Sequence, residues 1–424
     1  MRKHFVKLRL ALLTLLICLA AAAVFFWPSD RQSGEAPQAS TAVDLMSRGR
    51  ALVSLGNCES CHTTRGGLPF AGGRSIPTPF GTFYSPNITQ DARHGIGRWS
   101  ADDFWRALHN GKAPGGTLLY PTFPYTNFTK ISRADSDAMF AYLKTIAAVS
   151  QPNREHQLKF PYSQRWLLAI WRGLFFTPGV YETDTQRDAE WNRGAYLVQG
   201  VAHCSACHES RNALGAVRSK NNPSGGLVLS WYAPSLSNSQ EAGVQAWSET
   251  DIVRLLRVGD TTFGPMAEVV YESLQHADEA DLKAIAVYLK SLPELNSRSG
   301  DNRPAVALAN RDLVMSNGQK IYADHCARCH GDVGEGQSIA APALKGSRIV
   351  NMNPSIDAVR IVLYGGYAPG TQLNPRPFGM PPFYPTLTSE QIASVLTYIR
   401  GSWGNGAPPI IPDDVEAGST GPLW

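Results

Sequence analysis

The chain has 424 residues, a length that suits about three domains. Its formal net charge is only +4 and no block of lysine and arginine occurs along it, which argues against nucleic acid as a partner. The 38 glycines and 29 prolines favour small helical domains joined by long loops over a large regular sheet.

The N-terminus combines a basic segment with an apolar one. Residues 2–9 contain four lysines and arginines, and residues 10–27 are apolar except for Thr14. As a helix, residues 10–27 would reach roughly 27 Å, about the thickness of a bilayer core. The basic flank predicts that the N-terminus stays in the cytoplasm and that the rest of the chain is exported. We expect a transmembrane anchor over residues 1–27; the alternative is a signal peptide that is cleaved between Ala20 and Ala23.

Three copies of the pattern Cys-x-x-Cys-His occur in the remaining chain. They are Cys58-Glu-Ser-Cys61-His62, Cys204-Ser-Ala-Cys207-His208 and Cys326-Ala-Arg-Cys329-His330. Two cysteines at this spacing can each form a thioether with one vinyl group of a haem, and the adjacent histidine is then held under the iron as its proximal ligand. The pattern therefore predicts three covalently bound haem c groups.

Zinc sites and redox dithiols also use closely spaced cysteine pairs. Zinc sites usually combine two such pairs within about twenty residues. The copies here are 146 (204 − 58) and 122 (326 − 204) residues apart, and each has its own histidine, which favours haem. The seventh cysteine, Cys18, lies in the apolar N-terminal segment, so no pair remains for a structural disulfide.

The same order of elements surrounds each copy. A helix leads into it, a loop with a proline follows, and then come a middle helix and a closing helix with apolar residues at i, i+3, i+4 and i+7. The leading helices carry Gly49, Gly194 and Gly318; the loop prolines are Pro86, Pro234 and Pro342; the closing helices are expected over residues 137–143, 281–289 and 391–399.

Two close contacts are expected in each repeat. The glycine has no side chain, so that the closing helix can cross the leading helix there and both can wall in the haem. The proline carbonyl is the expected acceptor for the Nδ1–H of the proximal histidine, a bond that fixes the ring and tunes the iron. Ser100 and Ser248 each precede an aspartate by three residues, which predicts capped N-termini for two middle helices.

This repeat plan resembles that of the class I cytochrome c fold. Residues 43–405 resemble the triheme cytochrome c subunits of bacterial membrane-bound dehydrogenases, on the segments 79–89, 95–100, 191–198 and 400–405. The catalytic partners in that group are quinoprotein alcohol dehydrogenases, flavin-dependent sugar-acid dehydrogenases and molybdenum hydroxylases. The resemblance is specific to the type of subunit and not to the dehydrogenase.

We therefore expect an all-α fold with three tandem class I cytochrome c domains after an N-terminal transmembrane helix. The expected segments are a linker over 28–42, domain 1 over 43–150, an apolar and aromatic connector over 151–186, domain 2 over 187–295, a linker over 296–310, domain 3 over 311–403 and an extended tail over 404–424. The part of the connector at 165–176 is so apolar that the cytochrome domains, a membrane surface or a partner subunit must cover it.

Methionine usually completes iron coordination in an electron-transferring cytochrome c. Met266 and Met380 are the expected sixth ligands of haems 2 and 3, because both are expected in Gly- and Pro-rich loops just before the closing helix. The corresponding position of domain 1 holds Phe123, so haem 1 either lacks a protein sixth ligand or takes one from His109 or His94. His109 at the end of a middle helix also suits a cation at a helix C-terminus.

Two further histidines directly precede a motif: His203 and His325 are expected to be surface residues that point away from the iron. The remaining methionines (Met46, Met139, Met315 and Met352) are interpreted as core packing.

The predicted function is electron transfer by a subunit that is not itself an enzyme. It would be anchored to the inner membrane with its haem domains in the periplasm, and would pass electrons from a dehydrogenase catalytic subunit to ubiquinone or the terminal oxidase chain. A molybdenum-hydroxylase or aldehyde-oxidising partner is favoured over a quinoprotein alcohol dehydrogenase. The alternative is peroxidase-like chemistry at haem 1, since an open iron position can bind a small ligand.

Overall fold

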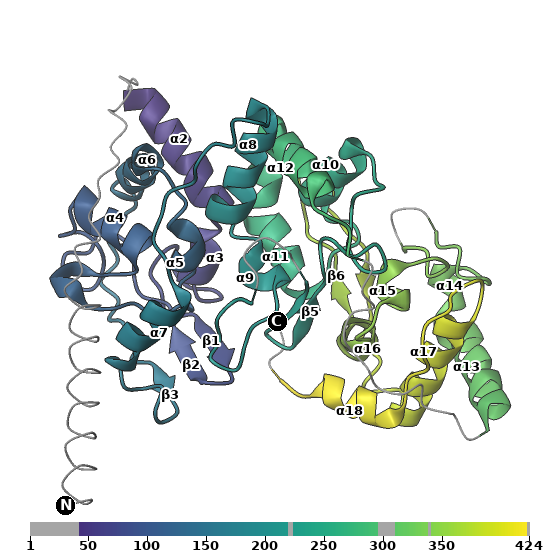
Figure 1. Cartoon of the computed structure of the whole chain (residues 1–424). Helices are drawn as coiled ribbons and strands as arrows, with labels where there is room; N and C mark the ends of the chain where they lie inside the picture. The colour runs from purple at the N-terminus through teal and green to yellow at the C-terminus, as the bar shows by residue number, and fades with distance from the viewer. Residues whose placement is uncertain (1–41, 219–223, 296–309, 338–340, 422–424) are drawn as a thin grey trace, which may run out of the picture. The chain divides into compact units, whose positions relative to one another are not determined.

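The computed structural model describes residues 42–218, 224–295, 310–337 and 341–421 (Figure 1). The chain divides into two compact units: unit 1 comprises Met1–Leu52 and His62–Glu182, and unit 2 comprises Val53–Cys61 and Thr183–Trp424. The division falls inside the first motif, so that Cys58 and Cys61 belong to unit 2 and His62 to unit 1.

Unit 1 contains the first repeat and the connector. Its helices, with α2 and α3 crossing the division, are α2 (Ala42–Leu55), α3 (Cys58–His62), α4 (Ala101–Asn110), the 3-10 helix η1 (Pro114–Gly116), α5 (Tyr125–Phe128), α6 (Arg133–Leu143) and α7 (Leu167–Phe175). A capping box starts α4 as expected: the Ser100 hydroxyl accepts from the backbone N–H of Asp103, whose carboxylate accepts from the backbone N–H of Ser100. Gly111 ends α4 in the left-handed conformation that glycine adopts without strain.

Unit 1 also contains a small antiparallel sheet in the order β1–β2–β3. The strands are β1 (Ser75–Thr78), β2 (Gly81–Tyr84) and β3 (Gln157–Leu158). Ser75 pairs with Tyr84 and Thr78 with Gly81 across a tight hairpin, and β3 brings the connector alongside β2 through the pair Gly81 and Leu158. Gly81 has a positive φ and no room for a Cβ beside the β3 backbone.

Unit 2 contains the second and third repeats. Its elements are α8 (Ala189–Tyr196), the π-helical turn η2 (Leu197–Val201), α9 (Ser205–His208), β4 (Gly226–Val228), β5 (Trp231–Ala233), α10 (Glu249–Val258), α11 (Gly264–Glu272), η3 (Leu274–His276), α12 (Glu279–Ser291), α13 (Arg311–His325), α14 (Ala327–His330), α15 (Arg348–Asn351), α16 (Ile356–Tyr364), β6 (Gly366–Tyr367), β7 (Gly379–Met380), α17 (Ser389–Gly401) and α18 (Pro412–Ser419). The hydroxyl of Ser248 accepts from the backbone N–H of Asp251, so the expected cap of α10 is confirmed.

The fold class expected from the sequence was wrong. The described residues form small antiparallel sheets as well as helices, and they group into two units instead of three tandem domains. Strands form where Gly-rich loops double back beside residues that favour extended backbone, such as Phe83 and Tyr84. The second and third repeats share one unit because contacts join them: Asp357 accepts from the backbone N–H of Tyr232 at 2.8 Å, and Arg348 donates to the Gly243 carbonyl at 2.6 Å.

None of the described helices has the length and apolar character that crossing a membrane requires. The expected anchor over residues 1–27 and nearly all of the two expected linkers, 28–42 and 296–310, lie outside the described residues.

The expected helix crossings are confirmed in all three repeats. A Cβ on Gly49 of α2 would overlap the backbone carbonyl of Ala138 in α6. Gly194 of α8 meets Ala284 of α12 in the same way, and Gly318 of α13 meets Ser394 of α17. Figure 1 shows α8 beside α12 and α13 beside α17. Each leading helix therefore packs backbone to backbone against the closing helix of its own repeat.

The tail is not extended, contrary to expectation. Its helix α18 buries Val415 against the third repeat. The fully buried Arg360 of α16 donates to the carbonyls of Gly418 and Thr420 at 2.9 and 3.0 Å, and its guanidinium lies over the Trp231 ring at 5.2 Å. The tail folds back because its few apolar residues and its carbonyls complete the environment of a buried arginine.

Asp357 makes the stability of unit 2 depend on pH. Burial raises the pKa of its carboxyl to about 7, although the Tyr232 N–H and the Arg360 charge oppose this rise. The folded chain therefore binds more protons than the unfolded chain between about pH 4 and pH 7, and the free energy of unfolding falls as the pH rises through that window, by up to about 4 kcal/mol.

The substitution Asp357→Asn keeps an oxygen acceptor for the Tyr232 N–H and removes the titration. We expect denaturant unfolding to show Asp357→Asn gaining stability relative to the unaltered protein between pH 4.5 and pH 8. Asp324→Asn, on an exposed position of α13, is the matched control. A stability difference between Asp357→Asn and the unaltered protein that is equal at both pH values would contradict this account.

Candidate haem-binding sites

The proximal histidines are held alike in the three motifs. The Nδ1–H of each donates to the carbonyl of the loop proline: His62 to Pro86 at 2.7 Å, His208 to Pro234 at 2.7 Å and His330 to Pro342 at 2.9 Å. The expectation about these carbonyls is confirmed. Burial lowers the pKa of all three imidazoles, and the hydrogen bonds raise it by less. Each imidazole is thus neutral, with its proton on Nδ1 and a lone pair on Nε2 that can ligate iron.

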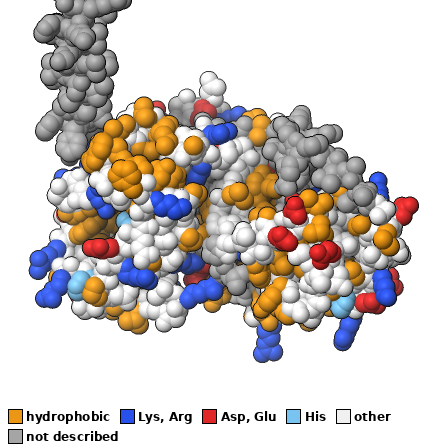
Figure 2. All heavy atoms as spheres, turned by 90° about the horizontal axis from the view of Figure 1, so that it is seen from below, with side chains coloured by type: hydrophobic (Ala, Val, Ile, Leu, Met, Phe, Trp, Pro, Cys, Tyr) orange, Lys and Arg blue, Asp and Glu red, His pale blue; other side chains and the backbone are white. Residues whose placement is uncertain are grey.

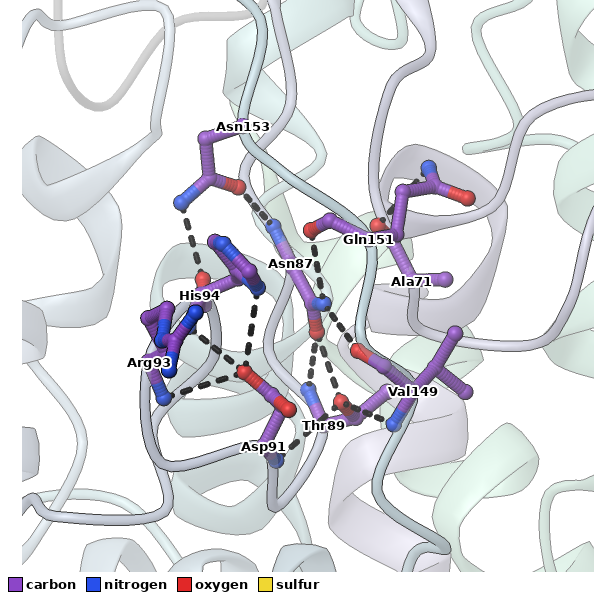
Figure 3. Close-up of polar contacts among 9 residues, drawn as sticks. All are labelled: Ala71, Asn87, Thr89, Asp91, Arg93, His94, Val149, Gln151 and Asn153. Carbon is purple, nitrogen blue, oxygen red and sulfur yellow. Dashed lines mark hydrogen bonds and ion pairs between the residues drawn. The ribbon is translucent and has the colours of Figure 1, made fainter.

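In unit 1 the next residue, Asn87, holds the peptide that carries the Pro86 carbonyl; Figure 3 shows the contacts of Asn87. The buried Asn87 side chain donates to the carbonyls of Val149 and Gln151 and accepts from the backbone N–H and hydroxyl of Thr89. Its backbone N–H donates to Asn153 Oδ1 at 2.7 Å. These bonds tie the loop to the chain after α6, so that Asn87 positions the acceptor of His62.

In unit 2, different residues hold the loops that carry the Pro234 and Pro342 carbonyls. After Pro234, the backbone N–H of Ser235 donates at 2.6 Å to the buried carboxylate of Glu241, which also accepts from Asn238 Nδ2 at 3.1 Å. After Pro342, the Asn405 side chain donates to the Leu344 carbonyl at 3.1 Å. Sequence reasoning missed these three positioning residues, Asn87, Glu241 and Asn405. A short polar side chain one residue after the loop proline was the available signal for Asn87.

None of the six motif cysteines forms a disulfide, so all six are available for haem attachment. Burial raises the pKa of Cys58 and Cys204 to about 12 and that of Cys326 to about 11, with the neighbouring cysteine adding to the rise. The thiols are therefore neutral at physiological pH. Each motif thus offers two thiols for thioether bonds and an imidazole with a free Nε2, a donor set that fits haem c, which supplies one-electron redox chemistry when bound.

The expected sixth ligands of haems 2 and 3 lie after the middle helix of their repeats. Met380 is the second residue of strand β7, where it pairs with Gly366 of β6. Met266 was expected in a loop, but it is the third residue of the nine-residue helix α11. Pro265 suits the first turn of a helix, and the apolar residues after it continue the turn. Ligation by Met266 and Met380 remains a prediction from the sequence.

Phe123 occupies the corresponding segment of unit 1, between the left-handed Gly111 that ends α4 and the N-cap Ser132 of α6. Like Met380, it precedes a proline. Its ring packs against Phe128 with the centroids 5.4 Å apart. The two methionines of this repeat lie on helices: Met139 is fully buried in α6, and Met46 lies in α2.

The two candidate histidines of repeat 1 have protein partners. His109 Nδ1–H donates to the Thr129 carbonyl at 3.0 Å, and the ring stacks on Trp105 at 4.5 Å. His94 Nδ1 lies 3.3 Å from Asp91 Oδ1 (Figure 3). Ligation of haem 1 by either residue stays a prediction.

The two histidines that precede a motif differ from each other. His325 is exposed, as expected. His203 was expected at the surface, but it is partly buried and its Nε2–H donates to the Gly56 carbonyl at 3.2 Å. The sequence could not reveal this bond because 147 residues separate the partners.

Comparison with known proteins identifies the family. The cytochrome c family matches residues 315–403. The cytochrome c subunit of gluconate 2-dehydrogenase from Pantoea cypripedii is 39% identical over 384 residues, which cover 86% of each chain. This chain belongs to the cytochrome c subunits of dehydrogenase complexes. The cytochrome c subunit of the quinone alcohol dehydrogenase of Gluconobacter oxydans is 37% identical over 86% of this chain and 80% of the relative. A subunit of the nicotinate dehydrogenase of Pseudomonas putida is 38% identical over 86% of this chain and 31% of that longer protein.

Membership of these cytochrome c subunits establishes the class of chemistry. The chain carries covalently bound haem c, transfers electrons and is not itself the catalytic subunit, and its partner is the catalytic subunit of a dehydrogenase.

Proposed function

We propose that this cytochrome c subunit carries three haem c groups and passes electrons from a dehydrogenase catalytic subunit to ubiquinone or the terminal oxidase chain. The observation that carries the proposal is the threefold recurrence of one arrangement: a Cys-x-x-Cys-His motif whose histidine donates to a loop proline at 2.7, 2.7 and 2.9 Å. A single such bond suits any buried histidine. Three such hydrogen bonds, each after a Cys-x-x-Cys-His motif, support three imidazoles that ligate iron.

The test uses the native complex and the isolated subunit. Of gluconate, a primary alcohol, an aldehyde and nicotinate, we expect at least one to reduce the haems in the complex and none to reduce them in the isolated subunit. A ubiquinone analogue should reoxidise the reduced haems. Peroxide turnover by the isolated subunit, without any reduction through a co-purifying dehydrogenase, would favour the haem enzyme over the electron carrier. Molybdenum or quinone analysis of the co-purifying subunit identifies the class of partner.

We also infer that the haem-bearing part lies in the periplasm and is held at the inner membrane. Haem attachment to cysteine suits the exported side, and the basic and apolar segments at residues 2–27 support export.

The connector helix α7 supports contact with a lipid surface. It buries Leu168, yet Trp166, Ile170 and Leu174 are 64%, 51% and 66% exposed. Figure 2 shows hydrophobic side chains gathered on the part of the face where α7 lies. Residues 156–181 contain three basic residues and no acid. A tryptophan-rich apolar face with a basic flank suits the interface of an anionic membrane.

The triple substitution of Trp166, Ile170 and Leu174 by serine tests this contact. In a chain of residues 28–424 that is exported behind a cleavable signal peptide, we expect it to weaken co-sedimentation with phosphatidylglycerol vesicles at least tenfold, because each side chain contributes about 1.5–3 kcal/mol when fully buried. Leu313→Ser, at an exposed position of α13, should leave co-sedimentation unchanged. Equal sedimentation of the triple variant and the unaltered chain would exclude α7 from the contact.

A further inference from the structure

The segment that carries the cysteines of the first motif is fastened to the second repeat by three hydrogen bonds, all within unit 2. The Gly56 carbonyl, two residues before Cys58, accepts from His203 Nε2–H at 3.2 Å. The Leu55 carbonyl accepts from the buried Ser273 hydroxyl at 3.2 Å. The Ser60 hydroxyl, between the two cysteines, donates to the Glu268 carboxylate. Residues 55–61, the first attachment segment, are thus held both before the first motif and within it.

The residues that hold the first attachment segment lie near both the attachment cysteines and the expected methionine ligand of haem 2. His203 directly precedes Cys204, on the attachment side. Glu268 lies in α11 two residues after Met266, on the side of the expected methionine ligand. The helix α11 and the second motif therefore contact the first attachment segment together.

His203 is suited to a permanent contact. Burial lowers the pKa of its imidazole, which is therefore neutral at physiological pH and holds the proton that Nε2 donates. Its backbone is in the left-handed region with φ of 40°, which an ordinary side chain adopts only under strain unless contacts compensate. His325, in the same position before the third motif, ends the helix α13 and is exposed.

We propose that His203 is a positioning residue that fixes haems 1 and 2 as a directly coupled pair. Haems held on Cys58 and Cys61 and on Cys204 and Cys207 would then exchange one electron directly, the ferrous haem being oxidised as the ferric haem is reduced, with no proton moved. The bonds from Ser273 and Glu268 hold the same segment, which makes the placement of Cys58 and Cys61 relative to the second motif a property of unit 2. This inference rests on the proposed three-haem function.

The test is His203→Asn in the full chain, with His325→Asn as the matched control. Asparagine tolerates the left-handed backbone, so the variant removes the imidazole with little strain. Haem content is measured first. With three haems present, we expect His203→Asn to reduce the exciton couplet in the Soret circular dichroism at least twofold and to shift the midpoint potentials of two haems. The third potential should stay unchanged, and His325→Asn should alter neither signal.

The outcomes separate the two proposals. Fewer than three haems in the unaltered protein would overturn the three-haem function. Three haems in His203→Asn with the couplet and all potentials unchanged would overturn the coupling alone. If His203→Asn does not mature, Ser273→Ala, which removes one hydroxyl bond to the same segment, carries the same expectation and the same contradiction.

Discussion

Replacing Gly194 by valine should abolish the mature protein. A Cβ at this position of α8 would overlap the backbone carbonyl of Ala284 in α12, and it would also lie 2.8 Å from the Tyr288 Cβ. Backbone atoms cannot rotate out of the way as a side chain can, so relief requires separating the two helices that flank the second motif. Overpacking a core costs about 1–3 kcal/mol even where side chains can give, and a whole domain is stable by only about 5–15 kcal/mol.

The measurement is the haem content and yield of exported Gly194→Val. We expect little or no haem-containing protein, with the apoprotein degraded. The matched control is Gly406→Val, in the same unit, where a Cβ meets nothing within 4 Å and no left-handed backbone is needed. Recovery of Gly194→Val with normal haem content would mean that the helices do not cross at this glycine.

The second large effect concerns haem 1. Phenylalanine cannot ligate iron, so haem 1 of the natural protein should differ from haems 2 and 3, and the near-infrared sulfur-to-iron band of the oxidised protein should correspond to two methionine-ligated haems. Phe123→Met should add a third equivalent of that band. Phe123 lies in the segment that holds Met266 and Met380 in the other repeats, and it shares with Met380 a following proline.

Carbon monoxide and histidine variants complete this test. An open haem 1 should be high-spin and bind carbon monoxide when reduced; a histidine-ligated haem 1 should be low-spin and lose that state in His109→Ala or His94→Ala. Phe128→Met, which changes the ring that packs on Phe123, is the control and should add no sulfur signal. Three sulfur-ligated haems in the natural protein would contradict the alignment of the repeats and would make Met46 or Met139 a ligand.

The sequence predicted the contacts that join residues three apart or that recur in every repeat. The serine caps join residues three apart, whereas the loop prolines and the crossing glycines stand in the same order in each repeat although their partners are distant in the sequence; the structure confirms all of them. Recurrence in three repeats, and not distance along the chain, made the proline and glycine contacts predictable.

The failures involve long-range contacts or competing local preferences. The burial of His203 depends on Gly56, 147 residues away, and the folding of the tail depends on the buried Arg360 of α16. The β1–β2–β3 sheet forms in a loop where Gly81 permits a tight hairpin, which a helical pattern cannot reveal. Met266 was assigned to a loop because of Gly264 and Pro265, although proline also suits the first turn of a helix.

The central claim is that this subunit holds three covalent haems on three equivalent motifs. The most direct measurement is the intact mass of the mature, exported protein under denaturing conditions, which retain thioether-bound haem. We predict a mass that exceeds the polypeptide by three haems, and His330→Ala should retain the third haem through Cys326 and Cys329 while losing its normal iron coordination. A well-matured natural protein that carries two haems or fewer would contradict the claim.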